Sequence, residues 1–250
     1  MKDSQAPLTG RKVLITGAAK RLGGAVALAL AEQGADIVIH YHRSKREATA
    51  LSEQIRQTGA AAWLVQGDLM DQKQMERLFE QARAQAGAIN ILINNASIFD
   101  KDTLWQTTED SLWRNLQVHA MAPLILARAL AKQTDTGHVI NFLDTRVVCY
   151  DQEHASYHLS KRILLTLTRM LAMELAPNIA VNAIAPGLIL PPAGKDERYL
   201  QELAHTNPLN RHGSPRDITE AVLFLLRSRF ITGQIIYVDG GFHMKGRMYE

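Results

Sequence analysis

Short apolar segments alternate with helix-forming segments along the whole chain, and this alternation constrains the fold more than any other feature. The stretches between successive apolar runs are long enough for a helix. Strands joined by such connections lie parallel in one sheet, with helices covering both faces. The sequence therefore predicts an α/β fold with a doubly wound parallel sheet of about seven strands. The predicted strands are residues 12–16, 36–40, 61–66, 89–93, 137–142, 179–184 and 234–238.

Length and composition favour a single domain. Of the 250 residues, 46% are hydrophobic, which suffices for one core in a chain of this size. Neither a glycine- or proline-rich linker nor an internal repeat divides the sequence, so we predict one domain over residues 1–250. Within it, residues 188–214 have the mixed polarity of a mobile loop that sets ligand specificity, and an ordinary structural loop fits equally well.

Charge and residue content argue against several functional classes. The formal net charge is only +3, with basic residues scattered among acidic ones, so we expect no nucleic-acid partner. Apolar runs are too short to span a membrane and residues 1–8 do not resemble a signal peptide, so we expect no membrane partner and a cytoplasmic location. The single Cys149 excludes an intramolecular disulfide, and the scattered histidines lack the spacing of a metal site.

A glycine-containing turn, TGAAKRLG at 16–23, follows the first predicted strand and precedes a predicted helix at 22–33. A helix amino terminus has unpaired N–H groups and the positive end of the helix dipole, and glycine lets the backbone approach a phosphate closely. Arg21 stands where many dinucleotide-binding turns have a middle glycine, so a purely structural turn is the alternative. The place of the turn after the first strand favours dinucleotide binding.

The second predicted strand ends in a basic segment, HYHRS at 40–44, where NAD-binding proteins have an acidic residue. An acidic residue there binds the ribose 2′-hydroxyl of NAD, whereas a basic residue accommodates the 2′-phosphate of NADP. Lys20 and Arg21 would add positive charge beside the same ligand. An ordinary basic loop is the alternative, but the placement predicts NADPH as the cofactor.

Tyr157 and Lys161 lie four residues apart in a predicted helix at 153–174. At that spacing a phenol and an ammonium group share one face of a helix. Tyrosine titrates near pH ~10, and we expect the lysine cation to lower the pKa of the phenol toward the range of a working acid–base group. This spacing alone also fits a solvated helix face, so the interpretation depends on the other motifs.

Candidate ligand-binding residues follow the first six predicted strands. Because ligands of open parallel sheets bind at the carboxyl ends of the strands, we expect these residues to converge on one edge. The candidates for the cofactor are Gly17, Lys20, Arg21, Leu22, Gly23, His40, Tyr41, His42, Arg43, Ser44, Asp68, Leu69, Asn95, Ala96, Ser97, Tyr157, Lys161, Pro186 and Gly187.

Taken in order, the motifs make the chain resemble the short-chain dehydrogenase/reductase superfamily over essentially its full length. They are TG…G at 16–23, GDL at 67–69, NNA at 94–96, YxxxK at 157–161, PG at 186–187 and VDGG at 238–241. The resemblance implies a Rossmann-like fold and transfer of hydride from a nicotinamide. It also implies that Tyr157 donates the proton, that Lys161 bridges the nicotinamide ribose and the tyrosine, and that the protein is a homotetramer.

Within that superfamily, four features resemble the pteridine reductases: the segments at 16–23 and 40–44, NASxF at 95–99, and Asp144 in place of the usual serine. The resemblance implies that Phe99 and the nicotinamide sandwich a flat pterin ring, with Ser97 and Arg21 near its polar edge. Each residue also has a structural alternative. Phe99 would close the core under a loop, Ser97 would cap the next segment, and Arg21 would pair with a surface acid.

The prediction of the substrate depends on Asp144. A serine hydroxyl suits a carbonyl oxygen, whereas a carboxyl group suits the N–H groups and ring-nitrogen protonation of pterin reduction. We therefore predict catalytic roles for Asp144, Tyr157 and Lys161 in the reduction of a dihydropterin by NADPH. The alternatives are a strand-end aspartate that caps the backbone, a carbonyl reductase such as a 3-oxoacyl-carrier-protein reductase, and a non-catalytic NADP-sensing protein.

One position departs from the superfamily pattern. His119 stands where members have a helical asparagine that supports a water chain to the lysine. The dihydromonapterin reductases resemble this arrangement. That family is therefore a close alternative for the physiological role.

Overall fold

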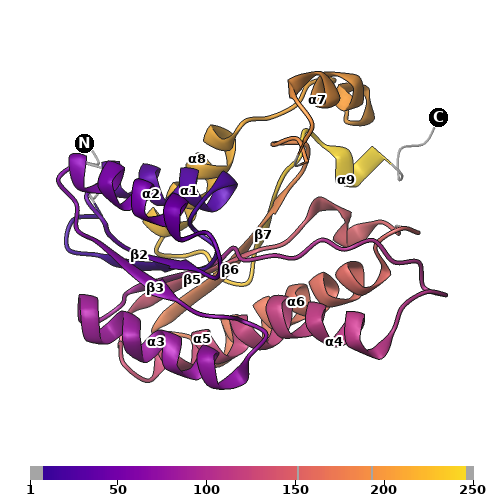
Figure 1. The fold of residues 1–250 in the computed structure, drawn as a ribbon. Coiled ribbons are helices and arrows are strands. Elements are labelled where there is room, and N and C mark those ends of the chain that lie inside the picture. The colour runs from indigo at the N-terminus through magenta and orange to yellow at the C-terminus, as the bar shows by residue number, and fades with distance from the viewer. Residues whose placement is uncertain (1–7, 151, 193, 246–250) are drawn as a thin grey trace.

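The computed structural model describes residues 8–150, 152–192 and 194–245. Within them, seven parallel strands form one sheet in the order β3-β2-β1-β4-β5-β6-β7. Figure 1 shows helices on both faces of this sheet, so the predicted doubly wound α/β fold is confirmed. The strands are β1 (Lys12–Ile15), β2 (Asp36–Tyr41), β3 (Ala62–Gln66), β4 (Ile91–Asn94), β5 (Gly137–Phe142), β6 (Ile179–Pro186) and β7 (Ile235–Val238).

The helices form two layers. One face of the sheet is covered by α1 (Arg21–Glu32), α2 (Lys45–Gln57) and α8 (Pro215–Arg227), and the other by α3 (Gln72–Ala86), α4 (Glu109–Leu116), α5 (Ala122–Ala131) and α6 (Ala155–Glu174) (Figure 1). A π-helical turn, η1 (Gln117–Met121), joins α4 to α5, and a short 3₁₀ turn, η2 (Thr145–Val148), follows β5.

The predicted loop at 188–214 is partly helical. It contains α7 (Glu197–Leu203) and the 3₁₀ turn η3 (Ala204–Thr206), and its residue 193 lies outside the described part of the chain. The last element, α9 (Phe242–Lys245), follows β7. Figure 1 shows α7 and α9 set apart from the two helical layers.

The core lies on both faces of the sheet, which is why apolar residues dominate the strands instead of alternating regularly with polar ones. Successive side chains of a strand point to opposite faces. In β1, Val13 and Ile15 pack in the cluster that includes α1 and α8, while Leu14 packs with α3 and α5. All three side chains are fully buried.

The order of the strands reverses between β1 and β4, and this reversal positions the site. Ile15 of β1 pairs with Ile39 of β2 on one side and with Ile93 of β4 on the other, so the three strands end close together. Connections leave these ends in opposite directions. A crevice for a ligand forms at such a switch point.

The boundaries of several elements differ from the predicted ones by one or two residues. The helix predicted from residue 153 begins at Ala155, because Glu153 and His154 are held in a short parallel bridge to Asp102. Ile89, predicted in β4, instead donates its N–H to the side chain of Gln133. Strand β6 runs past the predicted end at 184 to Pro186, because it continues to pair with β7.

No helix in the described residues is both long and apolar enough to cross a membrane. In the same part of the chain, no group of three or more His, Cys, Asp or Glu side chains is arranged to hold a metal ion. The extent of the domain and the cytoplasmic location stay predictions.

Candidate active site

The turn after β1 packs so closely against the end of β4 that only glycine fits at two positions. Gly17 has φ +62°, and a Cβ atom there would lie 2.9 Å from the Cα of Ala96. At Gly23 a Cβ atom would lie 2.5 Å from the side-chain nitrogen of Asn95. That nitrogen donates to the carbonyls of Thr16 and Gly17 at 3.0 and 3.1 Å. These contacts hold the turn against the end of β4, so that the amino terminus of α1 faces the crevice.

Arg21 occupies a backbone position that suits glycine, with φ +54° in the left-handed region. This conformation explains why many dinucleotide-binding turns have a glycine there. The guanidinium donates to the carbonyl oxygen of Pro191 at 2.8 Å. Arg21 therefore connects the turn to the loop at 188–214, and the alternative in which it pairs with a surface acid is wrong.

His40 shapes the turn from the end of β2. Its side chain is buried, Nδ1 accepts the N–H of Gly17 at 3.1 Å, and Nε2 lies 3.1 Å from the carbonyl of Gly67. Nδ1 has no proton to give, so Nε2 carries the proton and donates it. Burial lowers the pKa of His40 to about 4, so the ring is neutral at pH 7. Among the predicted cofactor residues, His40 therefore positions the turn at Gly17 and contributes no positive charge to the cavity.

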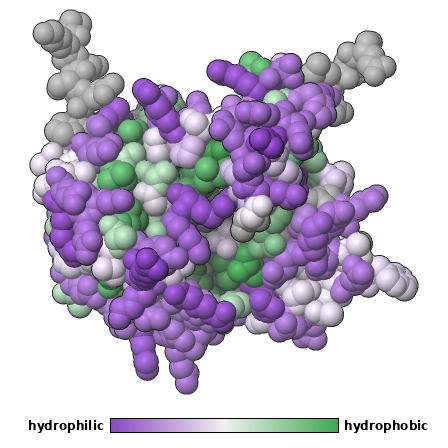
Figure 2. Space-filling model, turned by 45° about the horizontal axis from the view of Figure 1, so that its top comes forward, coloured by the Kyte–Doolittle hydropathy of each residue, from purple (hydrophilic) through white to green (hydrophobic). Residues whose placement is uncertain are grey.

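A cavity of about 560 Å³ opens between these turns. Figure 2 shows hydrophobic surface gathered in the middle of one face of the molecule and flanked by hydrophilic side chains. The structure brings all the predicted cofactor residues to the cavity wall except Tyr157, Lys161, Pro186 and Gly187. The wall residues are Gly17, Ala19, Lys20, Arg21, Leu22, Gly23, His40, Tyr41, His42, Arg43, Ser44, Asp68, Leu69, Met70, Asn95, Ala96, Ser97, Ile98, Arg114 and Val118.

Five of these wall residues are not among those predicted from the sequence. Ala19, Met70 and Ile98 are neighbours of predicted residues, and proximity to the motifs was the available signal. Arg114 and Val118 come from α4 and η1, and no motif or spacing in the sequence indicates them. Only the packing of α4 against α6, with the ion pair from Arg114 to Asp100 in the segment after β4, places them at the cavity.

Pro186 and Gly187 lie one strand farther along the sheet. Gly187 donates its N–H to Val238, and a Cβ atom there would lie 2.6 Å from the Cβ of Asp239. The PG and VDGG motifs thus pack against each other at the ends of β6 and β7. A contact with the nicotinamide end of a cofactor stays a prediction for both residues.

The wall of the cavity beside β2 carries the basic segment. Arg43 is exposed there, and Ser44 is the N-cap of α2, with a hydroxyl that forms no capping hydrogen bond. His42 lies 3.6 Å from the carboxylate of Asp68, measured from Nε2 to Oδ2. Arginine and a helix amino terminus both favour a bound phosphate.

Tyr157 and Asp144 are in direct contact. Tyr157 is the third residue of α6, is buried, and donates its hydroxyl proton to Oδ2 of Asp144 at 2.9 Å. The other carboxylate oxygen, Oδ1, accepts the N–H of Arg146 at 2.8 Å and caps η2. The capping role and a role beside Tyr157, which were separate alternatives, are combined in one carboxylate.

The expected effect of Lys161 on Tyr157 is wrong for this structure. Burial raises the pKa of Tyr157 well above its usual value, and the negative charge of Asp144 raises it further. Lys161 donates from Nζ to the carbonyl of Phe142 at 2.7 Å and lies 5.7 Å from the centre of the tyrosine ring. Burial lowers the pKa of Lys161 to about 8, while Asp144 opposes this shift. Tyr157 is therefore protonated and holds its proton more tightly than a free phenol does.

Phe99 forms an exposed aromatic wall beside Tyr157. One face of its ring stacks on His154, at 4.0 Å between centroids and 16° between planes. The rings of Phe99 and Tyr157 form a T-shaped pair, with 4.7 Å between centroids and 87° between planes. Because 52% of Phe99 is exposed, the alternative in which it closes the core is wrong.

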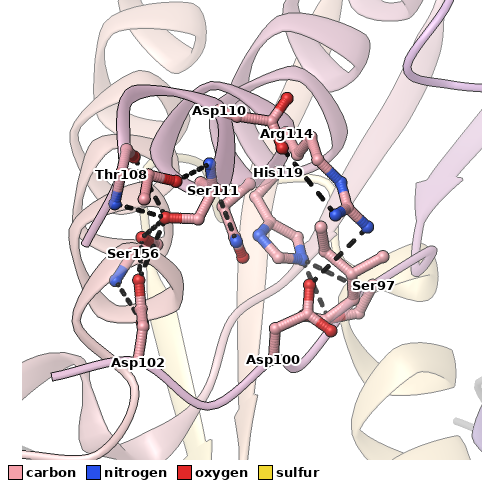
Figure 3. Close-up of polar contacts among 11 residues, drawn as sticks. Ser97, Asp100, Asp102, Thr108, Asp110, Ser111, Arg114, His119 and Ser156 are labelled. Carbon is pink, nitrogen blue, oxygen red and sulfur yellow. Dashed lines mark hydrogen bonds and ion pairs between the residues drawn. The ribbon is translucent and has the colours of Figure 1, made fainter. Parts of the chain in front are cut away.

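Asp102 fixes the start of α6 from a distant part of the chain. The N-cap of α6, His154, makes no side-chain capping bond, and Asp102 accepts the N–H of Ser156 at 3.1 Å instead. The same carboxylate accepts the hydroxyls of Ser156 and Ser111 (Figure 3). It thereby holds the residue next to Tyr157, a role that no sequence motif indicated.

Comparisons with known proteins agree with the fold and the motifs. The family model described as Enoyl-(Acyl carrier protein) reductase matches residues 17–243. An uncharacterized oxidoreductase of Methylorubrum extorquens is 33% identical over 243 residues, which cover 94% of this chain and 98% of that protein. The 3-oxoacyl-(acyl-carrier-protein) reductase FabG of Staphylococcus aureus is 31% identical over 250 residues, with 94% and 98% covered.

Two solved structures resemble the protein over nearly its whole length. FolM alternative dihydrofolate reductase 1 from Brucella canis, complexed with NADP, has a TM-score of 0.90 and 36% identity, and the match covers 98% of this chain and 97% of that one. A blue fluorescent protein from a metagenomic library, in complex with NADPH, has a TM-score of 0.88 and 34% identity, with 94% and 99% covered.

Proposed function

Because the chain belongs to the short-chain dehydrogenase/reductase superfamily, we propose that it is an NADPH-dependent reductase that converts dihydropterins to their tetrahydro forms. The observation that carries this proposal is the 2.9 Å hydrogen bond from the hydroxyl of Tyr157 to the carboxylate of Asp144. The exposed ring of Phe99 lies beside this pair. The names of the similar Brucella structures, dihydrofolate reductases with NADP, support a pterin-containing substrate.

The cavity fits NADPH in shape and in charge. Glycine at 17 and 23 lets the turn pack on the end of β4, and the backbone N–H groups at the start of α1 would hold the diphosphate. Arg43 and Ser44 suit a 2′-phosphate at the end of β2. NADPH supplies the hydride when it is bound.

The side chains of the chain itself handle the proton. We assign the proton donor to Tyr157, whose raised pKa keeps the hydroxyl protonated at pH 7 until a substrate nitrogen accepts it. Lys161, with a pKa of about 8, is mostly protonated at pH 7, and its ammonium group would hold the nicotinamide ribose of the cofactor. Asp144 accepts an N–H of the pterin, because an ionised carboxylate has only acceptor atoms.

Phe99 favours a flat substrate. A flat ring that stacks on the exposed Phe99 gains about 0.5–1.5 kcal/mol beyond the burial of area. Ser97 and Arg21 line the cavity of the predicted cofactor residues and supply polar groups for the edge of a pterin.

A second candidate function is the reduction of a 3-oxoacyl-carrier-protein thioester. The relative from Staphylococcus aureus and the description of the family model favour it. Asp144 argues against it, because a carboxylate next to Tyr157 would repel the oxyanion that develops at a carbonyl.

The test is NADPH oxidation by the purified protein with dihydrobiopterin, dihydromonapterin and dihydrofolate, and with an acetoacetyl thioester for comparison. Turnover of a dihydropterin supports the proposal and ranks the substrates. Tyr157→Phe serves as the control, because it removes the proton donor and leaves the cavity for NADPH unchanged. Reduction of the thioester alone would replace the pterin proposal with the second candidate. Tight NADPH binding without turnover would favour an NADP-sensing protein.

We also propose that the enzyme is a homotetramer. Support comes from apolar side chains at helical spacing on the outside of α6, namely Leu159, Ile163, Met170 and Met173, which are 42–84% exposed. Exposed apolar surface that is contiguous on one helix marks a face for another protein surface.

A further inference from the structure

His119 lies in the π-helical turn η1, and its role is not explained by the assignments above. Its side chain is 1% exposed. Its ring meets the ring of Tyr157 edge to face, with centroids 5.3 Å apart. Single π-helical turns are frequent at functional sites, because the extra residue redirects a side chain. Here the redirected side chain is His119, which points toward the segment after β4 (Figure 3).

The hydrogen bonds of His119 define its tautomer. Nε2 accepts the backbone N–H of Ile98 at 3.2 Å and lies 2.9 Å from the hydroxyl of Ser97. A backbone N–H donates only, so Nε2 has no proton and Nδ1 carries it. Nδ1 donates to the hydroxyl of Ser160 at 2.8 Å, and Ser160 donates to the carbonyl of Tyr157 at 2.7 Å.

This chain of hydrogen bonds is unsuited to carry a proton. It ends at the carbonyl oxygen of Tyr157, which has no proton to pass on and no exchangeable site beyond it. Burial, together with the positive charge of Lys161, lowers the pKa of His119 well below its usual value. The ring is therefore neutral, and both of its nitrogens are engaged inside the protein.

The segment 97–102 is fixed to the helices at both ends, as Figure 3 shows. At its far end, Asp100 lies 3.8 Å from the guanidinium of Arg114, and Asp102 holds Ser156 at the start of α6. At its near end, His119 holds Ser97 and Ile98. Phe99 is the next residue along the chain. The hydrogen bond from the N–H of Ile98 therefore fixes the backbone conformation that places the Phe99 ring against Tyr157.

We propose that His119 is a positioning residue that fixes Ser97 and Phe99 against Tyr157 and carries no proton in the reaction. The proposal rests on the proposed function, because that function assigns the substrate to the face of Phe99. It predicts that loss of the anchor weakens substrate binding more than it slows the chemical step.

Two substitutions separate the two halves of the His119 contact. The amide of asparagine in His119→Asn reaches the place of Nδ1, so it retains a donor for Ser160 and loses the acceptor for Ile98 and Ser97. The longer glutamine in His119→Gln reaches the place of Nε2 and retains that acceptor. His138→Asn is the matched control, because His138 lies at the amino end of β5, away from the cavity.

For His119→Asn we expect a KM for the dihydropterin about tenfold higher, with little change in kcat and unchanged midpoints of the pH profile. His119→Gln should keep a KM within about threefold of the wild type, and His138→Asn should not alter it. Equal loss of kcat in both His119 variants, with one limb of the pH profile missing, would overturn the proposal in favour of a proton carrier. An unaltered KM in His119→Asn would overturn it as well.

Two further measurements need no turnover. Deuterium uptake by residues 96–102 should be faster in His119→Asn than in the wild type and in His119→Gln. If the wild type reduces no dihydropterin while this difference persists, the proposed function fails and the anchoring of Phe99 stands. In the wild type, ¹⁵N-histidine NMR should show the Nδ1–H tautomer of His119 at neutral pH. An imidazolium or an Nε2–H tautomer would contradict the proposal even where a variant does not fold.

Discussion

At the scale of the residue, Asp144 determines the chemistry that this site favours. Its two oxygens have different partners, the N–H of Arg146 and the hydroxyl of Tyr157. A serine at this position would leave the phenol without a negative neighbour. The sequence indicated Asp144 and Tyr157 as catalytic candidates, but it could not indicate the sign of the pKa shift of Tyr157. That sign depends on burial and on the 2.9 Å contact, which the fold alone creates.

We expect Asp144→Ser to reduce kcat/KM for a dihydropterin by about 10²–10⁴ and to affect a carbonyl substrate much less. The variant removes the acceptor for the pterin N–H, and without the charge of Asp144 the pKa of Tyr157 falls toward its usual value. Steady-state kinetics with both substrates over a range of pH measure the effect. Asp144→Asn is the matched control, because it preserves the size and the cap on Arg146 while it removes the charge. Wild-type kinetics in Asp144→Ser would leave only the capping role.

At the scale of the element, the sequence predicted strands and helices well because each strand is a compact apolar run. Boundaries were less predictable where a residue from elsewhere decides them. The start of α6 depends on Asp102, and the start of β4 depends on Gln133. Arg114 reaches the cavity through the packing of α4, a long-range effect that no local pattern reports.

The connection from β2 to α2 gives a prediction at this scale. Arg43→Ala should raise the KM for NADPH by about 10–100-fold and leave the KM for NADH nearly unchanged, because a charged hydrogen bond to a phosphate contributes roughly 1.5–3 kcal/mol. Steady-state kinetics with the two cofactors make the comparison. Arg46→Ala is the control, since Arg46 is exposed in the first turn of α2, three residues from Arg43, and lies outside the cavity wall. Equal effects of Arg43→Ala on both cofactors would show that Arg43 does not bind the 2′-phosphate.

At the scale of the whole molecule, histidines whose pKa is lowered in the fold couple its stability to pH. Burial lowers the pKa of His40 from 6.5 to about 4, and burial together with Arg11 lowers that of His138 to about 4. Both remain neutral in the fold over a range in which the unfolded chain takes up their protons. Their contribution to stability is therefore complete above about pH 6.5 and is lost as the pH falls to about 4.

For His40 alone, the loss of free energy of unfolding between pH 7.5 and pH 4 is roughly 3 kcal/mol. Denaturant unfolding at a fixed protein concentration and at several pH values measures it. His40→Asn should be less stable than the wild type at pH 7.5, because its shorter side chain loses one of the two bonds, but its stability should depend less on pH. An equally steep dependence in this variant would show that His40 does not titrate on unfolding.

The outer face of α6 makes a prediction about assembly. Ile163 lies in the middle of the exposed apolar residues of this helix, and a tetramer that buries this face would have about four times the 27.8 kDa mass of one chain. Ile163→Asp places a charge there, and a charge buried without a partner costs several kcal/mol, so the variant should sediment as a smaller species at micromolar concentration. Sedimentation velocity of both proteins measures this change. Ala84→Asp on the exposed side of α3 is the control and should sediment like the wild type. A monomeric wild type would contradict the tetramer, and an intact tetramer in Ile163→Asp would move the interface away from α6.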